Sequence, residues 1–161
     1  MDFYFGKLRD EKELSLLKKF LLEHDMNYPN YETWVLKTCI SEINLGYKHA
    51  ILAFARQNSW ELVGNAIYQP SKELPETLHF KNMRVSEGFK RNGVASFLVR
   101  QVEQQARKQG LGTVILDFRL ERRDINLFFL AHGYKPLNIM PLYDNYNLDI
   151  VMAKNLEARA A

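Results

Sequence analysis

Cysteine is almost absent from this chain of 161 residues, in which Cys39 is the single one. One cysteine excludes an intrachain disulfide and favours the reducing environment of the cytoplasm. Its place in an amphipathic pattern favours a buried side chain over a nucleophile. Long apolar runs are absent too: none approaches the roughly 20 residues of a membrane span, and residues 1–5 do not begin a secretory signal. We therefore expect a cytoplasmic protein with no membrane partner.

Histidine and an excess of charge of one sign are also scarce. The four histidines are scattered, and no Cys/His pair has the spacing of metal ligands, so we expect no metal. The net charge is only +3, which does not favour nucleic acid as a partner. The charge is uneven, however: from Lys90 to Arg123 there are eight Lys or Arg and three acids, a net +5, against −2 for the rest. This positive segment favours a polyanionic ligand.

The residues that are present have the balance of a globular domain, with 47% hydrophobic and 25% charged side chains. No repeat or linker is found, and we predict a single domain over residues 1–156 with a frayed tail over 157–161. Hydrophobic periodicity predicts the elements. The expected strands cover residues 2–8, 49–56, 60–68, 77–85, 113–120, 134–143 and 148–153. The expected helices cover residues 10–24, 31–45 and 124–130, and a further long helix opens at the turn over 89–96 and ends at about residue 110.

The first two helices carry specific signals. Asp10, followed three residues later by Glu13, predicts the N-cap of the first helix. Gly46 is expected to end the second helix. The side chains expected to face inward from that second helix are Val35, Leu36, Cys39, Ile40 and Ile43.

The turn over residues 89–96, Phe-Lys-Arg-Asn-Gly-Val-Ala-Ser, is the most informative segment of the chain. It joins an expected strand to a long amphipathic helix, whose first N–H groups have no acceptor within the helix and carry the positive end of its dipole. Gly93 and Ala95 lack bulk, so an anion could approach the backbone closely. Lys90 and Arg91 add formal positive charge. The pattern predicts a pyrophosphate-binding turn.

Residues 89–95 resemble motif A of the GCN5-related N-acetyltransferases (GNAT superfamily), written Arg/Gln-x-x-Gly-x-Gly/Ala, with Lys90 at the Arg/Gln position. The order of elements over about residues 48–155 is similar to this family, and residues 128–134 resemble its Phe-Tyr-x-x-x-Gly-Phe ending. The resemblance implies an α/β (α+β) fold with a mixed, mostly antiparallel central sheet of about seven strands flanked by about four helices.

The resemblance also implies a function: acetyl-CoA-dependent transfer of an acetyl group to a primary amine of a small molecule, protein or peptide. Acetyl-CoA would be the co-substrate. Backbone N–H groups at the end of the fourth strand would hold the thioester, and those of the turn would hold the pyrophosphate. The residues expected at the cofactor are Met83, Arg84, Val85, Lys90, Arg91, Asn92, Gly93, Val94, Ala95, Ser96 and Phe129.

The proton-handling positions depart from the family pattern. Lys81 stands where many members carry a Glu, and a lysine acts as a base only if its pKa is strongly depressed. Phe129 stands where many members carry the Tyr that protonates the leaving thiolate. Candidate catalytic residues are therefore Asp117, Tyr143 and His79. The alternative roles are a salt bridge of Asp117 with Arg119 or a lysine, aromatic packing of Tyr143, and a sheet-surface or core position for His79.

Acceptor recognition in this family usually involves the region of the first two helices and the loop before the last strand. Here these segments hold five aromatic residues and three acids, which would suit a cationic amine. The aromatic residues are Tyr28, Tyr31, Trp34, Tyr143 and Tyr146, and the acids are Glu32, Asp144 and Asp149.

Two other functions remain open. The same fold could serve as a catalytically weak or inactive acyl-CoA-binding sensor or interaction module, which Lys81 and Phe129 favour. A transferase acting on aminoacyl-tRNA would use the positive segment to meet phosphates. The resemblance also leaves a homodimer open as an alternative to a monomer.

Overall fold

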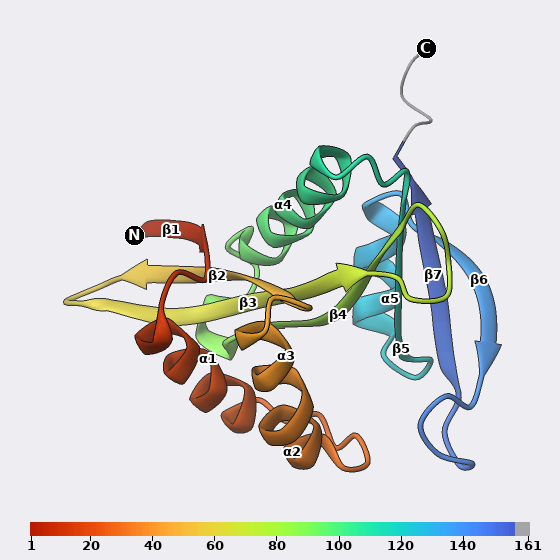
Figure 1. Cartoon of the computed structure of the whole chain (residues 1–161), viewed down its shortest axis with the longest axis horizontal. Helices are drawn as coiled ribbons and strands as arrows, with labels where there is room; N and C mark the ends of the chain where they lie inside the picture. The colour runs from red at the N-terminus through yellow and green to blue at the C-terminus, as the bar shows by residue number, and fades with distance from the viewer. Residues whose placement is uncertain (157–161) are drawn as a thin grey trace. The chain divides into compact units, whose positions relative to one another are not determined.

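The computed structural model describes residues 1–156, so the tail expected over 157–161 lies outside the described residues. Seven strands follow one another in the hydrogen-bonded order β1-β2-β3-β4-β5-β7-β6 (Figure 1). Strands β4 and β5 pair in parallel, and the pairs β1–β2, β2–β3, β5–β7 and β6–β7 are antiparallel. The predicted α/β fold with a mostly antiparallel sheet of seven strands is confirmed.

The element bounds follow the sequence pattern closely. The strands are β1 (Asp2–Lys7), β2 (His49–Arg56), β3 (Trp60–Pro70), β4 (Thr77–Val85), β5 (Thr113–Arg119), β6 (Lys135–Met140) and β7 (Asp149–Asn155). The helices are α1 (Glu11–Glu23), α2 (Tyr31–Trp34), the π-helical segment η1 (Val35–Cys39), α3 (Ile40–Asn44), the 3-10 turn η2 (Glu87–Phe89), α4 (Val94–Lys108) and α5 (Arg123–Ala131).

Two compact units make up the chain. The first consists of Met1–Gln69 and Asn82–Val102, and the second of Pro70–Lys81 and the chain from Glu103 onward. The boundaries between the units fall inside β4 and α4. The single domain expected over residues 1–156 stays a prediction.

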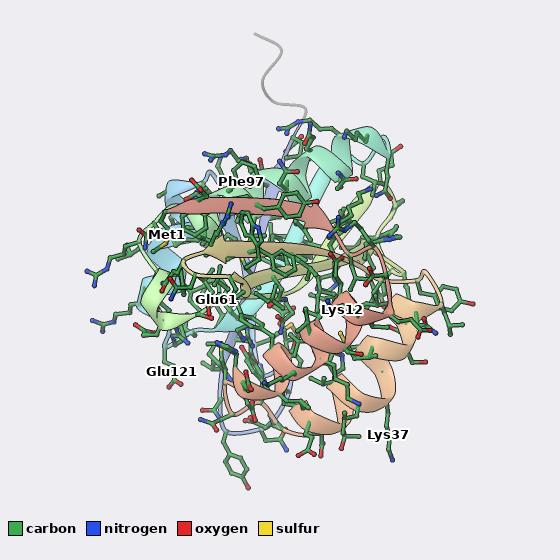
Figure 2. The ribbon with its side chains drawn as sticks, turned by 90° about the vertical axis from the view of Figure 1, so that its left-hand side faces the viewer. Met1, Lys12, Lys37, Glu61, Phe97 and Glu121 are labelled. Carbon is green, nitrogen blue, oxygen red and sulfur yellow. The ribbon has the colours of Figure 1, made fainter. Side chains whose placement is uncertain are left out.

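In the first unit, helices pack on β2 and β3. Leu17, Leu21, Val35 and Leu52 are fully buried in one core cluster, while Lys12 and Lys37 extend outward from their helices (Figure 2). Asp10 caps α1 as predicted, because its carboxylate accepts from the backbone N–H of Glu13 at 2.8 Å. On α4, Phe97 stacks on Phe5 of β1 with ring centroids 4.0 Å apart (Figure 2).

The helix expected over residues 31–45 is continuous but contains the π-helical turn η1. Val35, Cys39 and Ile43 are buried as predicted, whereas Leu36 is 40% exposed and that prediction is wrong. A π turn inserts an extra residue into the helical repeat, so side chains after its start no longer follow the 3.6-residue face. Gly46 ends the helix with φ of +80°, as expected.

The second unit contains β5, β6, β7, α5 and the first residues of β4. Its core includes Leu78, Val114, Phe118, Ile150 and Met152, all buried. Strand β6 lies at the edge of the sheet, and all six of its residues are exposed. It is shorter than predicted, because the chain after Met140 leaves the sheet for a loop of bends and turns that ends at β7.

Candidate functional site

The turn that precedes α4 has the geometry of an anion-binding loop. Arg91 and Gly93 adopt positive φ of 61° and 80°, and α4 begins at Val94. The Gly93 carbonyl accepts the N–H of Phe97 at 3.0 Å, so Gly93 is the residue from which the helix starts. The N–H groups of Val94 and the next residues therefore lie at the positive end of the helix dipole, directly after the two residues with positive φ.

Space is left in front of this turn. A Cβ built on Gly93 would meet no atom within 4 Å, and Arg91, Asn92 and Gly93 are exposed. Lys90 is also exposed and forms an ion pair with Glu87 at 2.5 Å, which offsets part of its charge. The backbone N–H groups, more than the Lys90 ammonium, are thus the fixed positive element of the turn.

Gly64 of β3 explains how the end of β4 and the start of α4 approach each other. A Cβ at Gly64 would lie 3.1 Å from the Arg84 carbonyl oxygen and 3.3 Å from Cγ1 of Val94. A side chain at this position would be crowded by both atoms, so glycine favours the close approach. Sequence reasoning did not single out Gly64, because a lone glycine within a strand gives no indication of which backbone comes near it.

The expected thioester-binding residues lie at the end of β4. The ladder between β4 and β5 runs from Thr77–Thr113 to Phe80–Leu116, so Met83 and Val85 lie beyond its last pair. The Arg84 side chain turns toward the segment that joins α1 and α2. Its Nε donates to the carbonyl of His24 at 3.2 Å, and its Nη1 donates to the carbonyl of Met83 at 2.8 Å. The guanidinium also lies over the ring of Tyr31.

The three candidate catalytic side chains form one cluster in the second unit. His79 Nε2 lies 3.4 Å from Asp117 Oδ1, and the Tyr143 hydroxyl donates to Asp117 Oδ2 at 2.5 Å. Strands β4 and β5 present His79 and Asp117, and the loop between β6 and β7 presents Tyr143. Of the expected alternative partners of Asp117, Arg119 pairs with Asp144 and Asp149, and Lys81 acts on Asp117 through its charge.

Electrostatics in this cluster favour an ionised Asp117. Burial, the largest influence, raises the pKa of Asp117, but hydrogen bonds from His79 and Tyr143 together with the charges of His79 and Lys81 hold it below its ordinary 3.8. Burial also lowers the pKa of Lys81, and the attraction of Asp117 opposes that shift. The cluster thus holds a carboxylate with two proton-bearing neighbours, a typical unit of acid–base chemistry.

An ion-pair network fixes the loop that carries Tyr143. Arg119 donates to Asp144 Oδ2 at 2.8 Å and to Asp149 Oδ2 at 3.5 Å, and its guanidinium lies over the Tyr143 ring. The N–H of Leu142 donates to Asp149 Oδ2 at 3.1 Å. Asp144 and Asp149, which the sequence suggested as partners of a cationic substrate, therefore bind Arg119.

The other expected site residues have mixed surroundings. Phe129 is 3% exposed and packs against Phe80, Phe118 and Tyr134 in the second unit. Tyr31 is also buried, and its hydroxyl donates to the carbonyl of Leu21 at 3.0 Å. In contrast, Tyr146 is 95% exposed.

One pair of polar side chains escaped the sequence analysis. His24, at the C-terminal end of α1, faces Ser86, which directly follows β4; the distance from Ser86 Oγ to His24 Nε2 is 3.3 Å. The two residues are 62 positions apart, and no motif links them. Only the packing of α1 beside the end of β4 could reveal the pair.

Within residues 1–156, no three His, Cys, Asp or Glu side chains are grouped as metal ligands would be. Across the same residues, none of the helices combines the length and the apolarity that a membrane span needs.

Known proteins match the chain along most of its length. Residues 14–134 match the model of the Acetyltransferase (GNAT) family. The tRNA(Met) cytidine acetyltransferase TmcA of Aeropyrum pernix is 35% identical over 79 residues, which are 48% of this chain and 11% of that protein. The chain thus spans a small part of the length of this curated relative.

Solved structures have the same fold at low sequence identity. The NatC complex bound to Gag peptide and CoA superposes with a TM-score of 0.79 at 15% identity, covering 97% of this chain and 99% of that one. The PaiA N-acetyltransferase of Thermoplasma acidophilum, in complex with coenzyme A, gives a TM-score of 0.71 at 16% identity, covering 96% of this chain and 99% of that one. At these identities the similarity establishes the fold.

Proposed function

Because the chain belongs to the acetyltransferase (GNAT) family, we propose that it transfers the acetyl group of acetyl-CoA to a primary amine of a small molecule, protein or peptide. The observation that carries the proposal is the turn before α4. Its positive φ at Arg91 and Gly93, and the open space at Gly93, suit a pyrophosphate bound by backbone N–H groups. Coenzyme A carries such a group, and two proteins of the same fold are described in complex with it.

Under this proposal, the cofactor residues keep the roles that the resemblance implied. The turn from Lys90 to Ser96 binds the pyrophosphate through its backbone. The end of β4, Met83 to Val85, binds the thioester arm through backbone groups, and an N–H there stabilises the oxyanion of the tetrahedral intermediate. Phe129, which stands at the position of the usual tyrosine, stays a proposed cofactor residue.

The cluster of His79, Asp117 and Tyr143 is proposed to handle protons. An acceptor amine must be neutral before it attacks, and the leaving thiolate is protonated afterwards. Asp117 stays ionised and orients its neighbours by accepting from both, which leaves His79 as the proton acceptor and Tyr143 as the proton donor.

A second candidate function is an acyl-CoA-binding sensor without turnover. Two observations favour it: Lys81 replaces the usual Glu, and Phe129, which has no proton to donate, is buried among aromatic rings. This candidate shares the CoA-binding turn with the first, and the two differ in whether an acceptor amine triggers release of free CoA.

The test of the proposal is thiol release from acetyl-CoA in the presence of small amines, polyamines, peptides and tRNA. Cys39 does not interfere, because it is fully buried and burial raises the pKa of its thiol to about 12. Amine-dependent release, with the acetylated amine identified by mass spectrometry, is the expected result. Binding of acetyl-CoA without release on any acceptor would favour the sensor, and absence of binding would contradict both functions.

A further inference from the structure

Arg84 places a positive charge beside the backbone that is proposed to bind the thioester. It lies on β4 between Met83 and Val85, and its Nη1 donates to the Met83 carbonyl at 2.8 Å. That bond holds the guanidinium against its own strand. The three residues belong to the first unit and are partly exposed. A small molecule that reaches this end of β4 therefore comes close to the charge of Arg84.

Contacts on several sides fix the guanidinium in place. Its Nε donates to the carbonyl of His24 at 3.2 Å, and the group lies 6.0 Å from the centre of the Tyr31 ring. Tyr31 is held in turn, because it is buried and its hydroxyl donates to the carbonyl of Leu21 at 3.0 Å. A cation that is already held in position loses little conformational entropy when it binds a ligand.

These contacts add no negative charge beside the guanidinium, since two carbonyls and a ring are neutral. Burial, the largest influence, raises the pKa of Tyr31, and the charge of Arg84 opposes that shift. Asp25 has a smaller influence in the opposite sense to Arg84, and its own carboxylate accepts the N–H of Asn27 at 2.8 Å. Of the formal charges that act on Tyr31, that of Arg84 has the larger effect.

Side chains expected to recognise a cationic amine are engaged within the protein. Asp144 and Asp149 bind Arg119. The ring of Tyr31 already lies against a cation of this chain, the guanidinium of Arg84. These observations favour an acceptor that brings negative charge to Arg84. A guanidinium is planar and matches a carboxylate with two parallel hydrogen bonds.

We propose that Arg84 binds the carboxylate of the acceptor, and that the acceptor is a small amine that also carries a carboxylate, such as a free amino acid. The inference rests on the proposed binding of the thioester by Met83 to Val85. With its carboxylate on Arg84, the acceptor presents its neutral amine to the thioester carbonyl. Arg84 is a specificity-determining residue and takes no part in proton transfer.

Two other roles of Arg84 make different predictions. His24 is the C-cap residue of α1, so Arg84 could serve only to stabilise the end of that helix through the His24 carbonyl. Alternatively, its charge could stabilise the oxyanion of the tetrahedral intermediate. Neither role depends on whether the acceptor carries a carboxylate or a neutral amide. The choice between acid and amide therefore isolates the proposed role.

The kinetic experiment compares two matched pairs of amines with the full chain and acetyl-CoA: glycine with glycinamide, and β-alanine with β-alaninamide. Rates are expressed per neutral amine, since a neighbouring carboxylate raises the pKa of an amine. The wild type should prefer the acid of at least one pair by about 10–100-fold in kcat/KM, the usual effect of a hydrogen bond to a charged group. The pair with the larger preference gives the reach between amine and carboxylate.

Arg84→Met, which keeps an unbranched side chain, should remove this preference. The loss should lie mainly in KM for the acid, because the bound carboxylate is not a reacting group. Arg84→Lys should restore part of the preference, since the charge returns without the planar fork. Calorimetric titration of acetyl-CoA and urea denaturation establish that the variants are folded.

The control variant is Arg56→Met. Arg56 is an exposed arginine of the same unit whose guanidinium also lies 6.0 Å from the centre of an aromatic ring, that of Trp60. It should keep the preference of the wild type. A preference that is unchanged in Arg84→Met, or a kcat that falls equally for acids and amides in that variant, would overturn the inference and leave the transferase intact.

A binding experiment without acetyl-CoA separates this inference from the proposed function. Nitrogen-15 NMR follows the Nε–H of Arg84 during titration with N-acetylglycine, and N-acetylglycinamide is the neutral control. A saturable shift with the acid alone is expected, while the Nε–H of Arg56 should not move. This shift in a protein that acetylates no amine would support the carboxylate site and contradict the transferase. Absence of the shift would overturn the carboxylate site, whatever the enzyme's activity.

Discussion

At the scale of single residues, the pKa of Asp117 determines its chemical role. A base works best when its pKa lies near the working pH, and the neighbours of Asp117 hold its pKa below 3.8. Asp117 is therefore a poor proton acceptor but a good orienting carboxylate, comparable to the third member of a catalytic triad. This reasoning favours His79 over Asp117 as the proposed base.

The substitution Tyr143→Phe should raise the pKa of Asp117, because it removes the hydroxyl that donates to Oδ2. A carboxyl whose folded pKa is below its unfolded pKa stabilises the fold above its ordinary pKa, and this contribution disappears as the pH falls through the folded value. The variant should therefore be less stable than the wild type at neutral pH, and the difference should shrink on acidification. Carbon-13 NMR titration of the Asp117 carboxyl measures the shift directly.

Tyr146→Phe is the control for this titration. Tyr146 lies in the same loop but is 95% exposed, so loss of its hydroxyl should leave the Asp117 titration unchanged. Equal titration curves for Asp117 in the wild type and Tyr143→Phe would contradict the account of the cluster.

At the scale of elements, the approach of β3, β4 and α4 depends on Gly64. The change Gly64→Ala places a methyl group 3.1 Å from the Arg84 carbonyl and 3.3 Å from Val94, so those elements must shift. We expect a loss of about 1–3 kcal/mol in the free energy of unfolding, as for other overpacked sites, together with weaker binding of acetyl-CoA. Urea denaturation and calorimetry measure the two effects.

The matched control is Gly88→Ala. A Cβ at Gly88 would meet no atom within 4 Å, and its φ is outside the left-handed region. If the free energy of unfolding falls equally in Gly64→Ala and Gly88→Ala, close packing at Gly64 is not the cause of the lost stability.

The network of Arg119 joins β5 to the loop before β7. Arg119→Met should cost about 3–5 kcal/mol of stability, because it leaves the fully buried Asp149 carboxylate without its positive partner. Urea denaturation measures the loss. Arg122→Met is the control: its ion pair with the exposed Asp124 lies at the surface and should contribute about 0–1 kcal/mol. Similar losses in the two variants would refute the central role of the buried pair.

The bounds of the elements were largely predictable from the sequence. Strands β2 and β4, for example, end where the hydrophobic periodicity and the turn residues predict. The cap at Asp10 was also predictable, because its signal is local. The π-helical turn η1 was not predictable, because its residues suit an α-helix equally well. In the structure, Leu36 is exposed and does not lie on the buried face of the helix. Contacts between distant segments, such as the one between His24 and Ser86, depend on packing that no spacing encodes.

At the scale of the whole molecule, the charge distribution bears on the partner. The segment from Lys90 to Arg123 carries a net +5 by sequence. Several of its cations pair with acids outside the segment, since Lys90 binds Glu87 and Arg119 binds Asp144. The positive field available to a phosphate backbone is thus weaker than the count suggests. The homodimer left open by the sequence stays a prediction.

Binding of tRNA should accordingly be weak and only modestly dependent on salt. Each phosphate that a protein neutralises on a single strand adds about 0.7 to the slope of log affinity against log salt. For this chain, at net +3, we expect a slope of magnitude no greater than about 2. Fluorescence anisotropy over a salt series measures it. A much steeper slope would favour the alternative function of a transferase that acts on tRNA. The partial match to a tRNA(Met) cytidine acetyltransferase also raises this alternative.

The most direct test of the central claim is calorimetric titration of acetyl-CoA into Gly93→Glu and Gly46→Glu. The two glycines share φ of +80°, and a Cβ on either would meet no atom within 4 Å, so the backbone strain of the two variants is matched. If the turn before α4 binds the pyrophosphate, Gly93→Glu should abolish binding through bulk and negative charge, while Gly46→Glu should bind like the wild type. Binding by Gly93→Glu with wild-type affinity would contradict the cofactor site on which the proposed acetyl transfer depends.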